Sequence, residues 1–405
     1  MSSELQGPLQ GYRVLELCST IAGPACTRMM ADFGAEVIKI EPPQGDPVRK
    51  FGVPDQGVEL CAAAILRNKQ TVTIDLKSDQ GVELVRALAA RCDIVVENFR
   101  PGTLERLGLG YEQLSADNPG LVLVRISGYG QSGPYSQKAG YGAICEAFGG
   151  IRELIGEPGK PPVRVAVPVT DYLAATYAAF GAVTALLHRE RTGQGQVVDT
   201  ALYEAAFSMM EGNVPSYDRF HVAPVREGSR LPYMAPNNLY LTADDAYLLI
   251  AANNDAVFAR LATAINKPEL VDDPRFATIA VRWENVDAID AEIGEWVGAH
   301  SGADAQAMLD EAGVPASLVY TLHEIFQDPH YREREMLLDV PHPVFGTLAQ
   351  PGIVPKLSAT PGAVRWHGRK QGENTREVLG AQLGLDEAAL DQLEAAGVIS
   401  SGSEQ

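Results

Sequence analysis

Short apolar strands alternate with helices through the first 200 residues, and this alternation restricts the fold more than any other feature of the sequence. Strands are predicted at residues 12–17, 36–40, 71–76, 93–97, 121–126 and 196–200. Helices are predicted at 81–91 and at 24–33, where Pro24 opens the helix and Gly34 closes it. Strands joined through helices pair in parallel, because a parallel pair needs a long crossover. We therefore predict an α/β fold with helices on both faces of a parallel sheet.

The pattern changes near Asn213. A hairpin is predicted from residues 239–242 and 247–250, which flank Asp244 and Asp245. Helices follow around 255–266, 284–299 and 303–311, and the tail returns to strand and helix, including 385–395. A chain of 405 residues is long for a single core. We predict a large α/β domain from residues 1–212 and 340–405, a smaller α+β domain at 225–325, and linkers at 213–224 and 326–339.

Composition excludes several classes of partner. The net charge of −19 argues against nucleic acid and against an anionic membrane surface. The acidic excess lies almost wholly after residue 150, so the first third is better suited to an anionic ligand. No apolar run approaches the roughly 20 residues of a membrane span, and the N-terminus lacks a signal-peptide pattern. These features predict a soluble, cytoplasmic protein with no membrane partner.

The cysteines predict neither a disulfide framework nor a metal site. Their number is odd, none forms a CxxC pair, and they are Cys18, Cys26, Cys61, Cys92 and Cys145. Buried free thiols are expected, and no metal.

In a dinucleotide-binding α/β fold, a glycine-rich motif follows the first strand. The segment 18–24 contains only Gly23 before the helix, so the G-x-G-x-x-G dinucleotide fingerprint is absent, and no Walker motif occurs. A phosphate can still bind the free N–H groups at that helix N-terminus. Basic residues follow the strands, namely Arg49, Lys50, Arg67, Lys69, Arg100, Arg106 and Lys138. Their spacing is compatible with a phosphate site at the carboxyl ends of the strands and equally with a solvated rim.

Asp171 is a single carboxylate in the otherwise uncharged stretch 165–175. It precedes a small-residue helix with apolar positions at 173, 177, 180, 183 and 187. The local sequence favours a helix N-cap, where a carboxylate accepts backbone N–H bonds. The alternative is a nucleophile held where a substrate can reach it.

Several strings resemble one enzyme family. They are Ala22-Gly23-Pro24, the run 31–41, Arg67-Asn68-Lys69, the run 97–102 with 108–111, the run 126–135 and the run 191–196. Taken in order along nearly the whole chain, they resemble the class III CoA-transferases, the family of formyl-CoA transferase, carnitine CoA-transferase and α-methylacyl-CoA racemase. The chain looks most like the members that handle short dicarboxylates.

The resemblance implies a fold and a mechanism. The large domain would be Rossmann-like and built from both chain ends, the smaller domain would lie in the middle, and two chains would form an interlocked homodimer. The catalytic residue would be Asp171, forming a mixed anhydride and then an aspartyl-CoA thioester. CoA would pass from an acyl-CoA donor, with succinyl-CoA as a candidate, to a small carboxylic acid.

The resemblance also implies positions that bind coenzyme A as a substrate, with no tightly bound cofactor. They are Ser19, Thr20, Ile21, Ala22, Leu66, Lys69, Asn98, Phe99, Arg106 and Lys138. The cations are expected to meet the phosphates, Lys69 and Arg106 above all, and Phe99 to offer an apolar face. This chain departs from the family at Pro42, where members often carry a basic residue, and at Gly142, where members usually carry an acidic residue.

Two other activities remain open from the sequence. An α-methylacyl-CoA racemase needs a histidine and an aspartate on opposite sides of the α-carbon. Racemases carry that histidine in the segment matching residues 139–143, whereas all seven histidines here lie at or after His188. This absence favours transfer. A non-catalytic CoA-binding subunit is the third hypothesis, and the presence of Asp171 argues against it.

Overall fold

The structure, a computed structural model, describes residues 7–402, which divide into two compact units. The first combines residues up to Ile151, Val165–Val214 and residues from His330 onward. The second combines Arg152–Arg164 with Pro215–Pro329. Segment 152–164 was predicted as part of the large domain, but it groups with the second unit, because it bonds to the 226–228 loop there.

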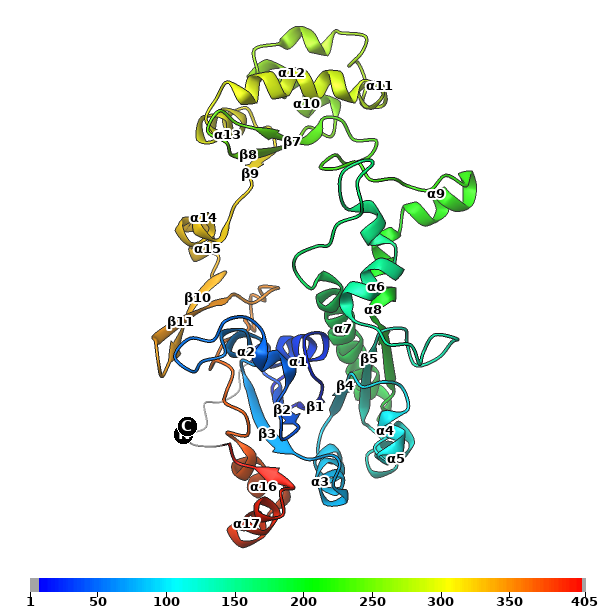
Figure 1. The fold of residues 1–405 in the computed structure, drawn as a ribbon, viewed down its shortest axis with the longest axis vertical. Helices are drawn as coiled ribbons and strands as arrows, with labels where there is room; N and C mark the ends of the chain where they lie inside the picture. The colour runs from blue at the N-terminus through cyan, green and yellow to red at the C-terminus, as the bar shows by residue number, and fades with distance from the viewer. Residues whose placement is uncertain (1–6, 403–405) are drawn as a thin grey trace. The chain divides into compact units, whose positions relative to one another are not determined.

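Within the described residues, the first unit is built on a seven-stranded sheet with the order β12-β3-β2-β1-β4-β5-β6 (Figure 1). The strands are β1 Arg13–Leu17, β2 Glu36–Glu41, β3 Lys69–Ile74, β4 Ile94–Glu97, β5 Val122–Ser127, β6 Val197–Ala201 and β12 Ile399–Ser400. Neighbouring strands pair in parallel, except that β12 pairs antiparallel with β3. The predicted α/β class with a mainly parallel central sheet is confirmed.

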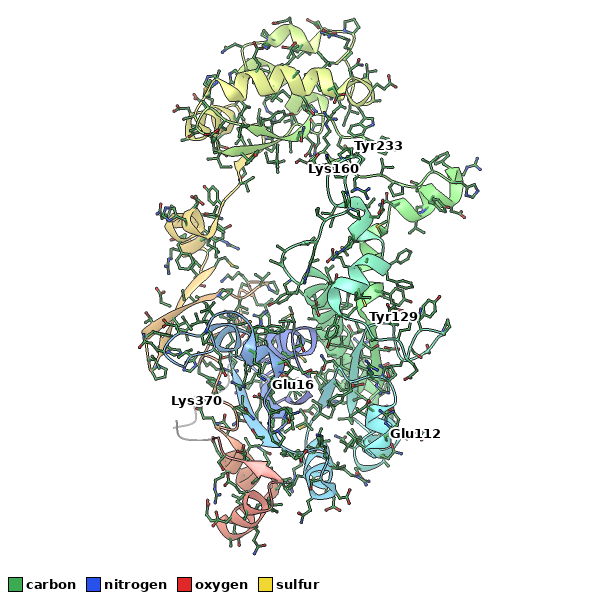
Figure 2. All side chains as sticks on the ribbon, in the orientation of Figure 1. Glu16, Glu112, Tyr129, Lys160, Tyr233 and Lys370 are labelled. Carbon is green, nitrogen blue, oxygen red and sulfur yellow. The ribbon has the colours of Figure 1, made fainter. Side chains whose placement is uncertain are left out.

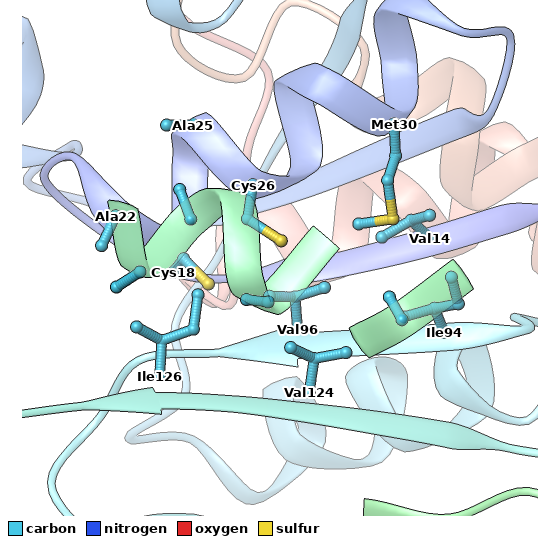
Figure 3. Close-up of a cluster of buried hydrophobic side chains, with 14 of the residues drawn as sticks. Val14, Cys18, Ala22, Ala25, Cys26, Met30, Ile94, Val96, Val124 and Ile126 are labelled. Atoms are coloured by element: carbon cyan, nitrogen blue, oxygen red, sulfur yellow. The ribbon is translucent and has the colours of Figure 1, made fainter. Parts of the chain in front are cut away.

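Helices cover both faces of this sheet because successive strand residues point to opposite sides. On one face Val14, Val96 and Val124 pack with Cys26 and Met30 of α1 (Figure 3). On the other face Leu15 and Leu123 join a second core with residues of α3, α16 and α17. Strands buried on both faces explain the continuous apolar runs in the sequence.

The helices of the first unit include α1 Ala22–Asp32, α2 Leu60–Ile65, α3 Asp79–Ala89, α4 Thr103–Arg106, α5 Tyr111–Asp117, α6 Gly142–Phe148, α7 Val169–Thr192, α8 Leu202–Phe207, α16 Thr375–Leu383 and α17 Glu387–Ala395. A hairpin of β10 Leu337–His342 and β11 Gly346–Pro351 is also part of this unit. The helix α9 Asn213–Phe220 begins at the boundary between the units.

The strand order reverses between β1 and β4. After β1 the chain moves to β2 on one side, whereas β4 pairs with the other side of β1. In open α/β sheets ligands bind in the crevice at such a switch point, outside the carboxyl ends of the strands. The loops after β1, β4 and β5 are therefore where a site is expected.

The second unit, all of which is described, contains a three-stranded antiparallel sheet of β7 Asn237–Leu241, β8 Tyr247–Ala251 and β9 Ala316–Leu318. The predicted hairpin is confirmed by the pairing of β7 with β8. Its helices include α10 Asp255–Ala264, α11 Ile279–Glu284, α12 Val286–Gly298, α13 Gly302–Glu311 and α14 Leu322–Gln327. Ile250, Phe258 and Ile293 lie in its separate core.

The five cysteines are free thiols. Four are buried, as predicted, whereas Cys61 is only half-buried and differs from the prediction. Among residues 7–402, no helix combines the length and apolar character needed to cross a bilayer.

Candidate active site

A cavity of about 200 Å³ opens at the switch point of the first unit. Its lining comes from the segments that follow β1, β4 and β5, together with the 136–141 loop, the first turn of α7 and the start of α8. Eight predicted site residues line it: Ser19, Thr20, Ile21, Ala22, Asn98, Phe99, Lys138 and Asp171. Tertiary folding thus brings together residues from four distant parts of the sequence.

The turn between β1 and α1 is fixed from two sides. Asn98 brackets Ser19, because its Oδ1 accepts the Ser19 N–H at 2.9 Å and its Nδ2 donates to the Ser19 carbonyl at 2.8 Å. Asp46 accepts the Thr20 N–H at 2.9 Å. Thr20 has a φ of 71°, in the left-handed region that is unfavourable for a β-branched residue. These bonds hold the turn in a strained conformation of the kind found at functional sites.

A buried ionic network lies beneath this turn. Glu16, labelled in Figure 2, forms salt bridges with Lys39 Nζ at 2.9 Å and with Lys69 Nζ at 2.8 Å. Lys39 also contacts Asp46 at 2.7 Å and donates to the Cys18 carbonyl at 2.9 Å. Lys69 donates to the Pro24 carbonyl at 2.7 Å. The side chains of Glu16, Lys39 and Lys69 are fully buried.

The pKa values follow from burial and charge. Burial alone raises the pKa of Glu16, but the charges of Lys39 and Lys69 outweigh it and lower that pKa to about 2. Burial lowers the pKa of Lys69, and Glu16 compensates only in part. The pKa of Lys39 is raised despite burial, because Glu16, Asp46 and Glu41 all favour its charge. Two lysines share Glu16, and only Lys39 contacts a second carboxylate in the described residues.

Three predicted CoA-binding residues do not line the cavity. Lys69 was expected to meet a phosphate, but its ammonium group is buried against Glu16 and the Pro24 carbonyl. Leu66 is fully buried in the core beneath α1. Arg106 is exposed on α4, where it donates to Thr103 Oγ1 at 3.0 Å. A sequence pattern gives a residue's type and order but not the direction of its side chain.

The segment after β4 is held by a second buried pair. Arg125 Nε donates to Glu97 Oε1 at 2.7 Å, and Glu97 Oε2 accepts the Phe99 N–H at 2.7 Å. Burial raises the pKa of Glu97 in spite of Arg125. This pair fixes the strand end from which Asn98 and Phe99 enter the cavity.

The cavity carries two cations, Lys138 and Arg100, among its described lining residues. Lys138 Nζ lies 3.4 Å from the ring centre of Tyr135, a cation–π contact. Tyr135 in turn contacts the rings of Tyr129 and Phe148 edge to face. Ser136 and Tyr141 were not predicted as site residues. Arg100 is one of the basic residues whose spacing is compatible with a phosphate site, and it directly follows the predicted pair Asn98 and Phe99 in the sequence.

Asp171 lies in the first turn of α7, whose N-cap is Pro168. The expectation that Asp171 is the N-cap is therefore wrong, because the helix begins two residues before it. A carboxylate in the first turn is still favoured by the helix dipole. Asp171 is half-buried, and its neighbours Thr170 and Ala174 are buried. Burial, with the Asp171 charge as a second cause, raises the pKa of Cys145 to about 11.

The backbone of Gly142 passes close beside the Asp171 carboxylate. A Cβ atom built on Gly142 would overlap Oδ2 of Asp171 and lie 2.9 Å from its Cγ. The preceding loop is equally close to β5, because a Cβ on Gly140 would lie 2.9 Å from the Cα of Gly128. The departure at Gly142 therefore has a structural consequence: the chain passes directly against the carboxylate.

No histidine is found among the described residues that line the cavity. His188 lies on the same helix as Asp171, but about 25 Å further along it at about 1.5 Å per residue. The described lining of this cavity therefore contains no histidine that could pair with Asp171.

Comparison with known proteins identifies the family to which this chain is similar. The model of "CoA-transferase family III" matches residues 9–375. The succinyl-CoA–D-citramalate CoA-transferase of Chloroflexus aurantiacus is 48% identical over 97% of this chain and 98% of its own length. The succinyl-CoA:glutarate CoA-transferase of Mus musculus is 34% identical over 97% of this chain and 90% of its own length.

A solved structure has the same fold. The crystal structure of a CAIB/BAIF family protein from Brucella suis superimposes with a TM-score of 0.83 and 33% identity, covering 93% of this chain and all of that one. The predicted family is thus confirmed along nearly the whole length. This chain belongs to CoA-transferase family III.

Proposed function

We propose that the protein transfers CoA from succinyl-CoA to a short dicarboxylic acid, with Asp171 as the covalent acyl carrier. The observation that carries this proposal is the presence of Asp171 in one cavity with Ser19–Ala22, Asn98, Phe99 and Lys138. Relatives named for succinyl-CoA with citramalate, malate or glutarate support the choice of donor and acceptor.

In the first half-reaction a carboxylate oxygen of Asp171 attacks the thioester carbonyl of the donor. The C–S bond breaks, CoA leaves as a thiolate, and a mixed anhydride joins Asp171 to the acyl group. The thiolate then attacks the Asp171 carbonyl carbon. This step forms the aspartyl-CoA thioester and releases the donor acid as a carboxylate.

In the second half-reaction the acceptor carboxylate attacks the aspartyl-CoA thioester, and the same steps run in reverse. The thiolate leaves, a new mixed anhydride forms, and the thiolate attacks the acceptor's carbonyl to give the product CoA ester and free Asp171. The position of Asp171 in the first turn of α7 favours the carboxylate form, which attacks the donor thioester in the first step and is released in the last.

The CoA chain is proposed to run along the carboxyl ends of the strands. The start of α1 offers backbone N–H groups without a side-chain cap, and Lys138 and Arg100 add positive charge for the phosphates. A second cavity of about 360 Å³ shares Ser19 and Phe99 with the first.

The second cavity suits the adenine ring. Its lining is largely apolar and includes Leu17, Ile40, Pro42 and Leu76. Pro42 supplies apolar surface at a position where family members often have a basic residue. Arg106 is kept as a proposed phosphate contact because its guanidinium is exposed. Lys69 and Leu66 are proposed to act indirectly, by supporting the β1–α1 turn and α1.

The active protein is proposed to be an interlocked homodimer. One side of α7 is apolar yet exposed, with Tyr172, Tyr177, Phe180, Val183 and Leu187 at helical spacing. Phe180 is 71% exposed and Leu187 56%, values that are unusual for a row of large apolar side chains on a monomer. A second copy of the chain is the proposed cover. Light scattering that gives only monomer at micromolar concentration would contradict it.

The function is tested by incubating the protein with succinyl-CoA and a panel of acids, and reading new CoA esters by mass spectrometry. Turnover is expected with short dicarboxylates and is expected to be lost in Asp171→Ala. Asp272→Ala, an exposed aspartate in the second unit, is the matched control.

Hydroxylamine or borohydride is expected to trap the thioester at Asp171. Deuterium exchange at the α-carbon of a branched acyl-CoA without an acceptor acid would instead support a racemase.

A further inference from the structure

The ammonium group of Lys138, one of the two cations in the described lining of the cavity, contacts a ring and not a carboxylate. Its Nζ lies over the ring of Tyr135, 3.4 Å from the ring centre. Among residues 7–402, no ion pair of Lys138 is found. The charge of Lys138 is therefore not cancelled by an acid, and it is available to an anionic ligand in the cavity.

The backbone brings Tyr135 and Lys138 together. The Lys138 N–H donates to the Tyr135 carbonyl at 2.8 Å, which closes a tight turn between the two residues. Nε2 of Gln137, within this turn, donates to the Pro101 carbonyl at 3.5 Å. This bond ties the turn to the segment after β4, which also lines the cavity.

The ring of Tyr135 is in turn held by other rings. Tyr129, labelled in Figure 2, lies 6.2 Å from it between ring centres, and Phe148 lies 5.9 Å from it, both at an interplanar angle of 75°. Phe148 also contacts Tyr203 of α8, at 5.3 Å. Edge-to-face ring pairs at such distances are favourable. Rings from the segment after β5, from α6 and from α8 thus support one orientation of Tyr135.

A supported ring changes what Lys138 can do. An exposed lysine samples many rotamers, and it loses this freedom when its ammonium group binds a phosphate. A contact with the Tyr135 ring removes part of that freedom before the ligand arrives. An ammonium group has three N–H donors, so it can keep the ring contact and donate to a phosphate at the same time.

We infer that Tyr135 is a positioning residue, whose ring face holds the Lys138 ammonium group at the cavity for the phosphates of the acyl-CoA. The inference rests on the proposed function, in which Lys138 adds positive charge for those phosphates. Tyr135 is not among the described residues that line the cavity, so it acts through Lys138. A cation–π contact at an exposed site corresponds to an affinity factor of about two to five.

The test is Tyr135→Leu, assayed with succinyl-CoA and the best acceptor acid. We expect KM for succinyl-CoA to rise about two- to fivefold while kcat stays within about twofold. Tyr135→Phe keeps a ring face and is expected to stay within about twofold of the wild-type KM. Tyr247→Leu, at an exposed tyrosine of the second unit, is the matched control. An unchanged or lower KM in Tyr135→Leu would overturn the inference, because the ring would then not hold Lys138 toward the phosphates.

Two further measurements separate positioning from general damage to the loop. In the Lys138→Met background, Tyr135→Leu is expected to leave KM at the value of Lys138→Met alone, because the partner of the ring is absent. With succinyl-pantetheine, a donor without phosphates, both single variants are expected to match the wild type. A further loss in the Lys138→Met background, or an equal loss with succinyl-pantetheine, would overturn the inference, because Tyr135 would then act on the loop itself.

Failure of this inference is distinguishable from failure of the proposed function. If Lys138→Met raises KM for succinyl-CoA and Tyr135→Leu does not, only the positioning role is lost. If Lys138→Met leaves that KM unchanged, the role of Lys138 in CoA binding fails, and the inference fails with it. If the wild type forms no new CoA ester, the proposed transfer fails, and the dissociation constant of CoA takes the place of KM in the same comparison.

Discussion

Two walls of the active-site cavity are held by opposite means. The β1–α1 turn rests on buried charges, with Lys39 joining Glu16 to Asp46 beneath Cys18 and Thr20. The wall near Gly142 is built from three glycines that allow close backbone approach. In the proposed function, the first wall lies along the CoA phosphates and the second lies beside the nucleophile.

The difference shows what each wall has to achieve. Phosphates and the pantetheine chain need a turn with fixed N–H groups, and buried ion pairs with hydrogen bonds can hold a strained turn. At Gly142 the second wall presents backbone in place of side-chain volume beside the Asp171 carboxylate. We therefore expect the first wall to respond to charge and pH, and the glycines of the second wall to respond to added side-chain volume.

The largest effect is expected from Lys39→Met. The change removes the ammonium group that Glu16 and Asp46 share, so both buried carboxylates lose this partner. Breaking a buried ion pair typically costs about 3–5 kcal/mol. The free energy of unfolding in urea should fall by that amount, and KM for succinyl-CoA should rise. Lys50→Met, at an exposed lysine, is the control. Wild-type stability in Lys39→Met would mean that the network does not hold this wall.

Acid should weaken the first wall through Glu16. Its pKa is about 2 in the folded protein against 4.5 in the reference state, so the unfolded chain binds more protons in this window. The contribution is present above pH 4.5, is about 3 kcal/mol at most, and is lost as the pH falls toward 2. The difference in unfolding free energy between wild type and Glu16→Gln should therefore narrow from pH 5 to pH 3. A difference that stays constant over this range argues against the ion pair.

Gly140→Ala tests the second wall by volume. Its Cβ would lie 2.9 Å from the Gly128 Cα and 3.2 Å from the Cys145 sulfur, and such overpacking usually costs about 1–3 kcal/mol. Unfolding should be easier by that amount at every pH from 3 to 7, because no titrating group is changed. A loss of stability that grows as the pH falls would show that the two walls are not separate.

The smallest effect is expected from Thr20→Gly, which relieves the positive φ of Thr20. Glycine adopts this conformation without steric cost, but it loses more entropy on folding, so the net gain in stability is expected to be below about 1 kcal/mol. KM for succinyl-CoA should nevertheless rise, because the turn becomes less rigid. Thermal unfolding and steady-state kinetics measure the two effects. Lower stability together with an unchanged KM would contradict strain at this turn.

The sequence by itself determined the α/β class and the family, and eight of the eleven residues it predicted for the site line the cavity. Alternating strands and helices restrict the pairing to parallel strands, and the family strings identify Asp171, Asn98 and Lys138 by their neighbours in the chain. The fold class and the family could be predicted because they depend on local periodicity and on order along the sequence.

Tertiary structure decided which groups meet. Lys69, predicted at a phosphate, is directed instead at Glu16, from which it is separated by 53 positions in the chain. Asp171, predicted as an N-cap, follows a helix start at Val169 and lies against Gly142. Burial and partner choice arise only when distant segments pack, because a side chain's environment is set by neighbours in space and not by neighbours in sequence.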